Sequence, residues 1–158
     1  NNGACVFNKY RCLTLELNRL IKNDDLEKNT TSFFVSETLK KLPKNTCIVS
    51  YADPNEGHNG YIYQSTNWVY TGTSTPKHRY YFKDGTSFDI RRGIHNKGEV
   101  IKKELLKPTH RYLYFIGSKK DIRNMKKDLK MDVKKYPKGN NKRYDTTYKP
   151  TIQTQLFL

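Results

Sequence analysis

The segment from Ser50 to Gly72 (SYADPNEGHNGYIYQSTNWVYTG) gathers side chains that can move protons. Asp53 follows a short apolar run and supplies a carboxylate, and His58 titrates near neutral pH, which suits general acid–base chemistry. Tyr63 lies ten residues after Asp53 and supplies a hydroxyl. Asp53 and His58 fit an ordinary turn equally well, so the residue types make the segment a candidate active site and leave a purely structural role open.

The aromatic residues of the same segment have two interpretations. Tyr61, Tyr63, Trp68 and Tyr70 can stack on a nucleic-acid base or fill a core. We predict that Trp68 belongs to the core, and the three tyrosines stay candidates for either role.

A second candidate site is the polar run Asn29-Thr30-Thr31-Ser32, directly before the apolar stripe of a predicted helix. Side-chain oxygens of such residues cap helices by accepting hydrogen bonds from free backbone N–H groups. Those N–H groups and the helix dipole also attract anions, so the run is a candidate site for a phosphate or carboxylate. It lacks the glycines of a standard phosphate cradle, and an ordinary capped helix explains it as well.

The elements that must position these residues alternate between strand and helix patterns in the first half of the chain. Strands are predicted where β-branched or alternating apolar residues occur, and helices where apolar residues recur at three- and four-residue spacing. The predicted order is strand Leu13–Ile21, a helix from Phe34 or Val35 to Leu42, strand Thr46–Tyr51, helix Gly57–Asn67 and strand Trp68–Thr71. This alternation is typical of an α/β layer architecture.

The pattern changes beyond Pro76. Asp84-Gly85 between aromatic runs predicts a β-hairpin, and a stretch without a clear period follows it. The predicted elements are a hairpin over Arg79–Ile90, a loop over Arg91–Pro108 and a strand over Arg111–Ile116.

A basic helix is predicted after that strand. Ser118 and Asp121 have the spacing of a capping box at its start. Its apolar residues share a single stripe: Ile122, Met125 and Leu129. Lys134–Lys149 is rich in Lys, Asn, Gly and Tyr and is predicted to be an arm that orders only on a partner.

The positive charge is concentrated in the second half of the chain. The net charge is +15, but residues 1–76 contain 8 Lys and Arg against 7 Asp and Glu, whereas residues 77–158 contain 22 against 8. Such an excess, with interleaved tyrosines, favours nucleic acid because binding releases counterions. We expect eight cations to make these contacts: Lys119, Lys120, Arg123, Lys126, Lys127, Lys130, Lys134 and Lys135. A solvated lysine-rich surface without a specific partner is the alternative.

Composition bears on several other classes of protein. The three cysteines form no CxxC pair, which argues against a disulfide framework or zinc site and favours a reducing, cytoplasmic location. No run approaches the roughly 18 apolar residues of a membrane span. No HxD or HxxxH cluster occurs, so no metal is assigned, although scattered His and Asp leave an iron open. Because the chain begins with Asn rather than Met, we expect a preceding segment in the intact reading frame.

The sequence resembles the phage Mom family, whose members modify adenine in DNA. The resemblance rests on the Ser50–Gly72 segment, on ELNRLIKNDDLEKNTTSFFVSETLKKLPK before it, and on HRYLYFIGSKKDIRNMKKDL with YPK after it, and it extends from Glu16 to Lys138. The same order is similar to the second half of a GNAT acyltransferase fold. The resemblance implies a GNAT-like mixed sheet flanked by helices. The catalytic core would cover residues 1–76, and a basic extension with a β-hairpin and a helix would cover residues 77–158. It also implies that further strands and a functional His of the family would lie before Asn1.

The family resemblance also implies an activity and an active-site set. Members convert the exocyclic amine of adenine to a carbamoylmethylated form, which shields phage DNA from host restriction. The matching residues are Arg19 in ELNRL, Asp53 in YADP and Tyr63 in IYQ, with His58 as a weaker candidate. Asp53 would orient or deprotonate the amine, Tyr63 would protonate a leaving group, and Arg19 would hold oxygens through its planar fork.

The donor and the partner follow from the same resemblance. Asn29, Thr30, Thr31 and Ser32 would meet the anionic part of the donor, which is either an acyl-CoA or an aminoacyl-type molecule. The expected partner is double-stranded DNA with a flipped adenine, because chemistry on a base amine requires the base to leave the stack. Two alternatives remain: a GNAT-like acyltransferase acting on tRNA or protein amines, and a non-catalytic nucleic-acid-binding module.

Overall fold

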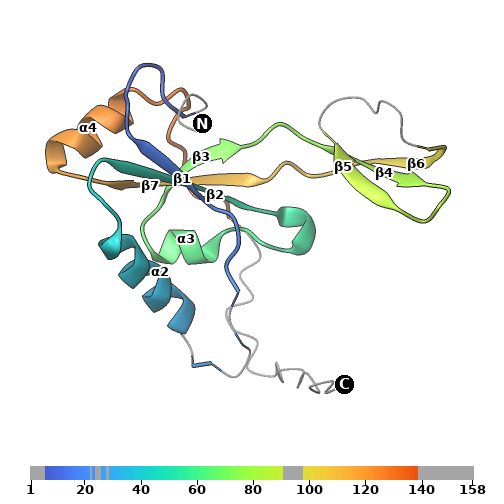
Figure 1. Cartoon of the computed structure of the whole chain (residues 1–158), viewed down its shortest axis with the longest axis horizontal. Coiled ribbons are helices and arrows are strands. Elements are labelled where there is room, and N and C mark those ends of the chain that lie inside the picture. Colours follow the sequence, from blue (N-terminus) through green and yellow to red (C-terminus); the bar gives the residue numbers. More distant parts are fainter. Residues whose placement is uncertain (1–5, 22, 24–25, 28, 91–97, 139–158) are drawn as a thin grey trace.

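The computed structural model describes residues 6–21, 23, 26–27, 29–90 and 98–138, and its fold is mixed α+β, as predicted (Figure 1). The elements in chain order are β1 (Leu13–Leu17), α2 (Thr30–Lys41), β2 (Thr46–Ala52), the 3-10 turn η1 (Pro54–Glu56), α3 (Tyr61–Ser65), β3 (Val69–Thr73), β4 (His78–Phe82), β5 (Ser87–Ile90), β6 (Val100–Leu105), β7 (His110–Ile116) and α4 (Lys119–Lys127). They form a four-stranded sheet, β1-β2-β7-β3, and a three-stranded sheet, β5-β4-β6. No helix within these ranges is long and apolar enough to cross a membrane.

The four-stranded sheet contains one parallel strand pair. β1 and β2 are parallel and are connected through α2, whereas β7 is antiparallel to both of its neighbours, β2 and β3. The register pairs Leu17 with Ser50 at the carboxyl ends of β1 and β2, and it pairs Ala52 with His110, where β7 begins. The ends of β1 and β2 and the start of β7 therefore meet at the same end of the sheet.

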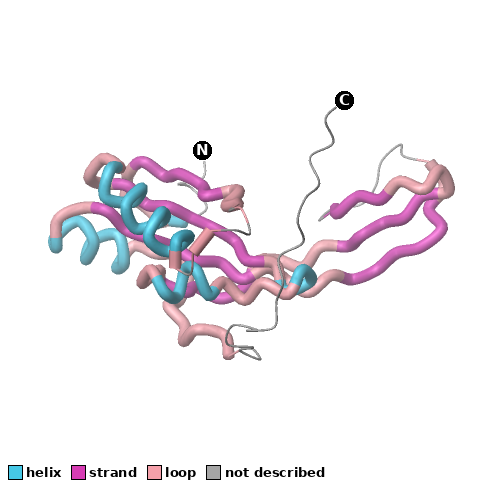
Figure 2. The backbone as a smooth tube through the Cα atoms, turned by 90° about the horizontal axis from the view of Figure 1, so that it is seen from below, coloured by secondary structure: helices cyan, strands magenta, loops and turns pink. Residues whose placement is uncertain are grey.

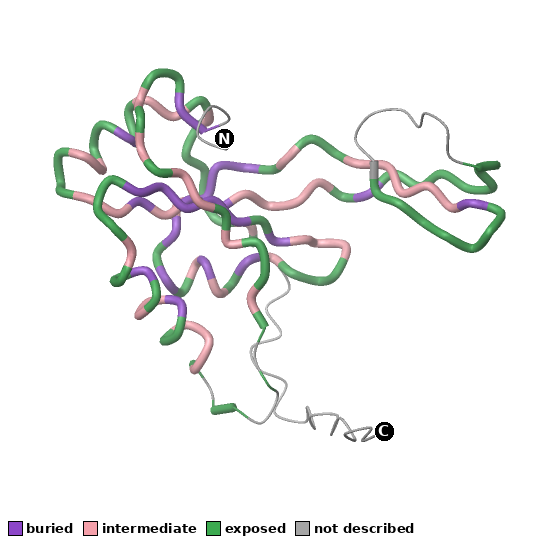
Figure 3. The backbone as a smooth tube through the Cα atoms, viewed as in Figure 1, coloured by how far each residue is buried: buried purple, intermediate pink, exposed green. Residues whose placement is uncertain are grey.

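Helices cover both faces of this sheet, and a core forms under each. On one face, α2 and α3 pack over Trp68 and Tyr112, which are fully buried. Most of the buried stretches lie in the four-stranded sheet and the helices beside it (Figure 3). On the other face, Met125 of α4 packs against alternate residues of β2 and β7 and against the N-terminal segment: Val6, Phe7, Cys47, Val49, Leu113 and Phe115. Burial raises the pKa of the Cys47 thiol to about 12. The prediction that Trp68 is a core residue is confirmed.

The three-stranded sheet projects from the four-stranded sheet as an insertion between β3 and β7 (Figures 1 and 2). Two backbone hydrogen bonds tie its connecting segments together, from Ser74 N to Thr109 O at 2.8 Å and from Leu106 N to Lys77 O at 3.0 Å. The predicted hairpin is confirmed as β4 and β5, with Gly85 at φ 81° in the turn. The described helices all lie with the four-stranded sheet.

The prediction of a loop over Arg91–Pro108 is wrong for Val100–Leu105, which is strand β6 and pairs with β4. Its sequence, VIKKEL, is mainly exposed, so it lacks the alternation of a half-buried strand. Residues 91–97 of the predicted loop lie outside the described residues. The division of the chain at residue 76 stays a prediction, but β7, from the second half, is an inner strand of the four-stranded sheet.

Two predicted elements are shorter than expected. The strand predicted over Leu13–Ile21 ends at Leu17. The helix predicted over Gly57–Asn67 is only α3, because Gly57 and Gly60 adopt φ of 73° and 78° and keep the preceding residues in a turn.

The two longer helices differ in how they begin. The Ser118–Asp121 capping box of α4 is confirmed, since each residue's side chain bonds to the other's backbone N–H. At α2 the predicted side-chain cap is wrong. Asn29 sits at φ 69° without a capping bond, and the hydroxyls of Thr30 and Ser32 donate instead to the carbonyl oxygens of Glu27 and Asn29.

The first part of the predicted Lys134–Lys149 arm is docked on the protein, so the prediction is wrong for it. Lys134 N donates to the Tyr70 carbonyl at 2.8 Å, and the Tyr136 hydroxyl donates to the Trp68 carbonyl at 2.5 Å. Residues 134–138 therefore follow β3 at the edge of the four-stranded sheet. The remainder of the predicted arm lies outside the described residues.

Candidate active site

A cavity of about 570 Å³ opens where β1 and β2 end. Adjacent parallel strands that both point toward it place their following segments around one space, as at the carboxyl ends of many α/β sheets. Four short stretches line the cavity: Asn18 to Ile21 after β1, Thr31 of α2, Tyr51 to Asp53 at the end of β2, and Gly57 to Tyr63. The four nominated catalytic residues, Arg19, Asp53, His58 and Tyr63, all belong to this lining.

Asp53 is held in a fixed orientation by Asn55. One carboxylate oxygen, Oδ1, accepts hydrogen bonds from Asn55 N at 2.8 Å and from Asn55 Nδ2 at 2.7 Å. No described residue hydrogen-bonds to the other oxygen, Oδ2. The Asp53 carbonyl accepts from Glu56 N and His58 N, which closes the η1 turn. Asp53 therefore presents a half-buried carboxylate with one oxygen available to a ligand.

Tyr63 is buried at the base of the cavity, with 7% of its surface exposed. Its hydroxyl lies 2.7 Å from Ser50 Oγ, which also lies 2.7 Å from the Leu17 carbonyl oxygen. Ser50 has a single hydroxyl proton and donates to one of the two at a time. When Ser50 donates to Tyr63, the proton of the Tyr63 hydroxyl is available to another acceptor.

An aromatic cluster supports Tyr63 from behind. Its ring centroid lies 5.0 Å from that of Trp68 and 5.1 Å from that of Tyr112. The Tyr112 hydroxyl donates to the Asn59 carbonyl, and burial raises the pKa of Tyr112 to about 12. A Cβ on Gly60, which lines the cavity, would lie 2.4 Å from the Tyr112 ring, so only glycine fits there.

The remaining nominated residues are less enclosed. Arg19 and His58 are exposed on the lining, and no described carboxylate forms an ion pair with either. Of the predicted anion-binding run, only Thr31 lines the cavity, while Asn29, Thr30 and Ser32 do not. The structure therefore places the four catalytic candidates around one cavity. Thr31 is the residue of the predicted anion-binding run that also lines this cavity, and it lies in the first turn of α2.

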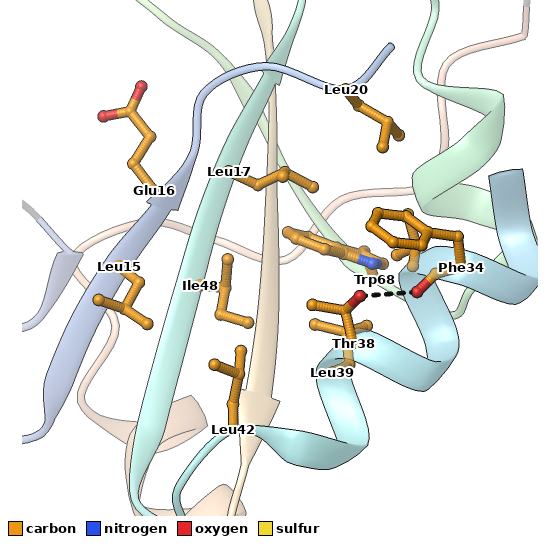
Figure 4. A pocket seen from close by; sticks show the side chains of 11 residues that line it. Leu15, Glu16, Leu17, Leu20, Phe34, Thr38, Leu39, Leu42, Ile48 and Trp68 are labelled. Atoms are coloured by element: carbon orange, nitrogen blue, oxygen red, sulfur yellow. Dashed lines mark hydrogen bonds between the residues drawn. The ribbon is translucent and has the colours of Figure 1, made fainter. Parts of the chain in front are cut away.

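A second, smaller cavity of about 140 Å³ lies between α2 and the sheet. Its lining is mainly apolar side chains from β1, β2, α2 and the segments beside them, together with Glu16, Thr38 and Trp68 (Figure 4). The Trp68 indole N–H has no hydrogen-bond acceptor among the described residues. Leu20 lines both cavities, so the apolar cavity adjoins the candidate site.

The nominated cations lie elsewhere on the protein. β7 runs from His110, beside Asp53, to Ile116, which is about 20 Å farther along the sheet at the usual rise per residue. α4 follows that far end (Figure 1). Its residues Ile122 and Met125 pack in the core cluster, and its cations are exposed. Lys119, Arg123, Lys126 and Lys127 line a groove there with Ile122. Lys130 follows α4, and Lys134 and Lys135 lie near β3.

Three residues of the site were not nominated from the sequence. Asn55 orients Asp53, and its position two residues later is typical of an Asx turn, which was a usable signal. Ser50 reaches Tyr63 only through the fold. Tyr51 is the single exposed residue of β2 and lines the cavity, although strand alternation alone does not show which face carries a site.

The fold and the cavity define a small α+β protein with a polar site at the carboxyl ends of two parallel strands. The Mom protein family matches residues 3–138, and the chain belongs to that family. Membership indicates a role in the modification of phage DNA. No curated protein matches the sequence. Among the described residues, no three His, Cys, Asp or Glu side chains come together as metal ligands.

Proposed function

We propose that this protein is a transferase that converts the exocyclic amine of adenine in DNA to a carbamoylmethyl-type adduct, which protects phage DNA from host restriction. The observation that carries the proposal is the cavity at the end of β1 and β2, which contains Arg19, Asp53, His58 and Tyr63 in a chain of the Mom family. Its volume of about 570 Å³ lies within the range of small-molecule sites.

The proposed roles follow from the contacts of each side chain. Asp53 Oδ2 accepts a hydrogen bond from the adenine amine and takes its proton, while Asn55 keeps Oδ1 occupied. Tyr63 donates its proton to the leaving group, and Ser50 supports the resulting phenolate by donating to it. Arg19 binds oxygens of the donor or substrate. His58, which is exposed, assists either as a base or as a DNA contact.

Base stacking is supplied by the exposed aromatic residues of the lining. Tyr51 and Tyr61 each expose 39% of their surface, and both line the cavity. A flipped adenine loses its neighbours in the duplex, and stacking on an aromatic ring offsets about 1–3 kcal/mol of that cost. Trp68 and Tyr70 are buried and support the site from behind, whereas Tyr63, which is also buried, is the proposed proton donor.

The donor is proposed to approach along α2 with its anionic part near Thr31. The order β1, α2, β2, α3, β3 supports a GNAT-like arrangement, in which a strand–loop–helix unit binds the donor and a later helix supplies a tyrosine. The apolar cavity beside Leu20 could receive an uncharged part of such a molecule. An acyl-CoA and an aminoacyl-type donor remain the two classes to test. Transfer from either bonds the adenine nitrogen to the carbonyl carbon of the donor and releases the thiol or hydroxyl of the carrier, so a carbamoylmethyl-type adduct, which is bonded through a methylene carbon, requires a further rearrangement.

The direct test is the nucleoside composition of DNA that is exposed to the protein. DNA from cells that express the intact reading frame would be digested to nucleosides and analysed by mass spectrometry for a mass-shifted deoxyadenosine. We expect modification by the natural protein and a loss of about 100-fold or more in Asp53→Asn and Tyr63→Phe. Ser65→Ala, an exposed change on α3 outside the cavity, is the matched control and should keep full modification.

Two results would contradict the proposal. One is an unmodified deoxyadenosine profile from the folded, intact protein. The other is full modification by Asp53→Asn and Tyr63→Phe, because the cavity would then not be the site of chemistry. Adducts on tRNA or protein amines in place of DNA would support the alternative acyltransferase.

A further inference from the structure

We propose that one face of the projecting three-stranded sheet is a DNA-binding surface that holds the duplex beside the cavity. This face, called the Tyr80 face, consists of His78, Tyr80, Phe88, Lys103 and Leu105. The opposite face, called the Tyr81 face, consists of Arg79, Tyr81, Asp89, Lys102 and Glu104. The identity of the polyanion as DNA rests on the proposed function.

The strand register separates the two faces. Directly paired residues of antiparallel strands share a face, and neighbours along a strand alternate. Tyr80 pairs with Lys103 and Phe88, whereas Tyr81 pairs with Lys102 and Ser87. Each lysine ammonium lies over the paired tyrosine ring, Lys103 at 5.5 Å from the Tyr80 centroid and Lys102 at 5.0 Å from the Tyr81 centroid. The two faces therefore carry equivalent lysine–tyrosine pairs.

Acidic residues distinguish the faces. Asp89 forms an ion pair with Arg79, and Glu104 contacts Lys102 and Tyr81, all on the Tyr81 face. The other two described carboxylates of this sheet lie at its outer end, where Asp84 bonds to Thr86 and Glu99 pairs with Lys83. No described carboxylate lies on the Tyr80 face. The positive charge of Lys103 on this face is thus not neutralised by any carboxylate of the described residues.

The composition of the Tyr80 face fits a nucleic acid. Leu105 and Phe88 expose 65% and 44% of their surface, beside the cationic Lys103 and the polar edges of Tyr80 and His78. Neighbouring strands are about 5 Å apart, and the major groove of B-DNA admits a two-stranded β-ribbon, so two of the three strands of this sheet suit its width. Lysine and aromatic side chains side by side bind phosphates and the apolar edges of bases.

A second copy of the protein suits this face less well. In a symmetric dimer the same patch meets itself. Lys103 would then approach its own copy without a described carboxylate in the interface, and burying unpaired like charges is unfavourable. DNA supplies the opposite charge that this face lacks.

The position of the sheet relative to the cavity supports the assignment. The projecting sheet leaves the four-stranded sheet at Thr73 and re-enters at His110, which is the end where Ala52 and Asp53 lie. Asn55 joins the two regions directly, because its side chain accepts from Lys107 N at 2.9 Å and donates to the Lys107 carbonyl at 2.9 Å. A duplex with one base in the cavity would pass this sheet, whereas α4 lies at the other end.

The test compares two neighbouring lysines of β6. Lys103→Gln and Lys102→Gln each remove one positive charge and one lysine–tyrosine contact, from opposite faces, and Lys102→Gln also removes the ion pair with Glu104. Binding of a duplex of about 20 base pairs, roughly two helical turns, would be measured over a range of salt concentrations. We expect Lys103→Gln to weaken binding roughly three- to tenfold and to lower the log–log salt slope by about 0.9, as for one lost phosphate contact. Lys102→Gln should bind like the natural protein.

A second measurement leaves the sequence unchanged. Acetylation of the natural protein, followed by peptide mass spectrometry, should show that DNA shields the Lys103 amine and leaves Lys102 reactive. Equal effects of the two variants, or equal shielding, would overturn the assignment while DNA binding and adenine modification by the natural protein persist. If the natural protein does not bind the duplex at all, the proposed function fails together with it.

Discussion

Tyr112 and Leu113 of the four-stranded sheet are fully buried, as is Trp68 directly before β3, whereas Phe82 is the one buried strand residue described in the three-stranded sheet. The first sheet has helices on both faces and two clusters of core residues. The stability of the second sheet depends on the backbone hydrogen bonds between its strands, on cross-strand lysine–tyrosine contacts and on surface ion pairs. Cross-strand contacts and surface ion pairs typically contribute about 1 kcal/mol or less each.

This difference indicates that the two sheets have different roles. The four-stranded sheet fixes the cavity because its residues cannot move without opening a core. The three-stranded sheet has little core to maintain, so its sequence is free to present charge and aromatic groups to a partner. Changes in the first should therefore act mainly on stability, and changes in the second mainly on binding.

The largest expected effect is that of Trp68→Ala. Trp68 is fully buried against Tyr63 and Tyr114, and removal of such a side chain costs about 3–5 kcal/mol of unfolding free energy. Leu105→Ala in the three-stranded sheet, where 65% of the side chain is exposed, should cost less than about 0.5 kcal/mol. Urea unfolding followed by circular dichroism measures both, and similar losses would remove the contrast between the sheets.

Two glycines, one beside the cavity and one in the three-stranded sheet, test the same difference in packing. Gly60 and Gly85 have φ of 78° and 81°, but a Cβ on Gly60 would meet Tyr112 at 2.4 Å and one on Gly85 meets nothing within 4 Å. Gly85→Ala should cost about 1 kcal/mol for the backbone alone. Gly60→Ala should cost about 2–4 kcal/mol because overpacking is added. Thermal unfolding of both variants would show whether packing against Tyr112 accounts for the difference.

Asn55→Ala tests the connection between the regions. The substitution removes one of two hydrogen bonds to Asp53 Oδ1 and both bonds to Lys107, so adenine modification should fall about tenfold, equivalent to about 1.4 kcal/mol. Hydrogen exchange at Lys107 N should accelerate, which is independent of activity. Asn124→Ala, on the exposed side of α4, is the control. Unchanged adenine modification together with faster exchange at Lys107 N would show that Asn55 stabilises the connection to the three-stranded sheet and has no role in the reaction.

The smallest expected effect is a local response of the three-stranded sheet to acid. The Arg79 guanidinium lowers the pKa of Asp89 below its ordinary value of 3.8. Because the folded pKa is the lower one, the stabilisation is present above about pH 4 and is lost as the pH falls through the folded value. Amide exchange in β4 and β5 should lose protection in that range, and Asp89→Asn should abolish the change. The strands of the four-stranded sheet contain no described buried carboxylate, so their amides should respond less.

Much of the fold could be predicted from local patterns. The apolar TCIVSY and RYLYFI runs indicated β2 and β7, Asp84-Gly85 indicated the hairpin, and Ser118 with Asp121 indicated the start of α4. β6 could not be recognised, because VIKKEL is exposed on both faces and carries no hydrophobic period. The docking of Lys134 and Tyr136 on β3 depends on tertiary hydrogen bonds that no local pattern encodes.

The candidate site was predictable where residue chemistry identified it. Asp53, His58 and Tyr63 stood out by type and spacing, and Arg19 through the family resemblance; the cavity brings all four together. Ser50 and Tyr51 could not be separated from other strand residues, because their importance depends on which end and face of the sheet they occupy. The distance of α4 from the cavity was equally hidden, since it follows from the antiparallel direction of β7.

The docking of residues 134–138 has a consequence for how the protein can associate. Lys134 N and the Tyr136 hydroxyl occupy the carbonyl groups of Tyr70 and Trp68, which are the acceptors that an incoming strand would need at β3. Among the described residues, no segment covers the outer edge of β1 in the same way. In the four-stranded sheet, pairing with a strand of another molecule is therefore obstructed at Tyr70 of β3 and open at β1, so the two edges of this sheet are not equivalent.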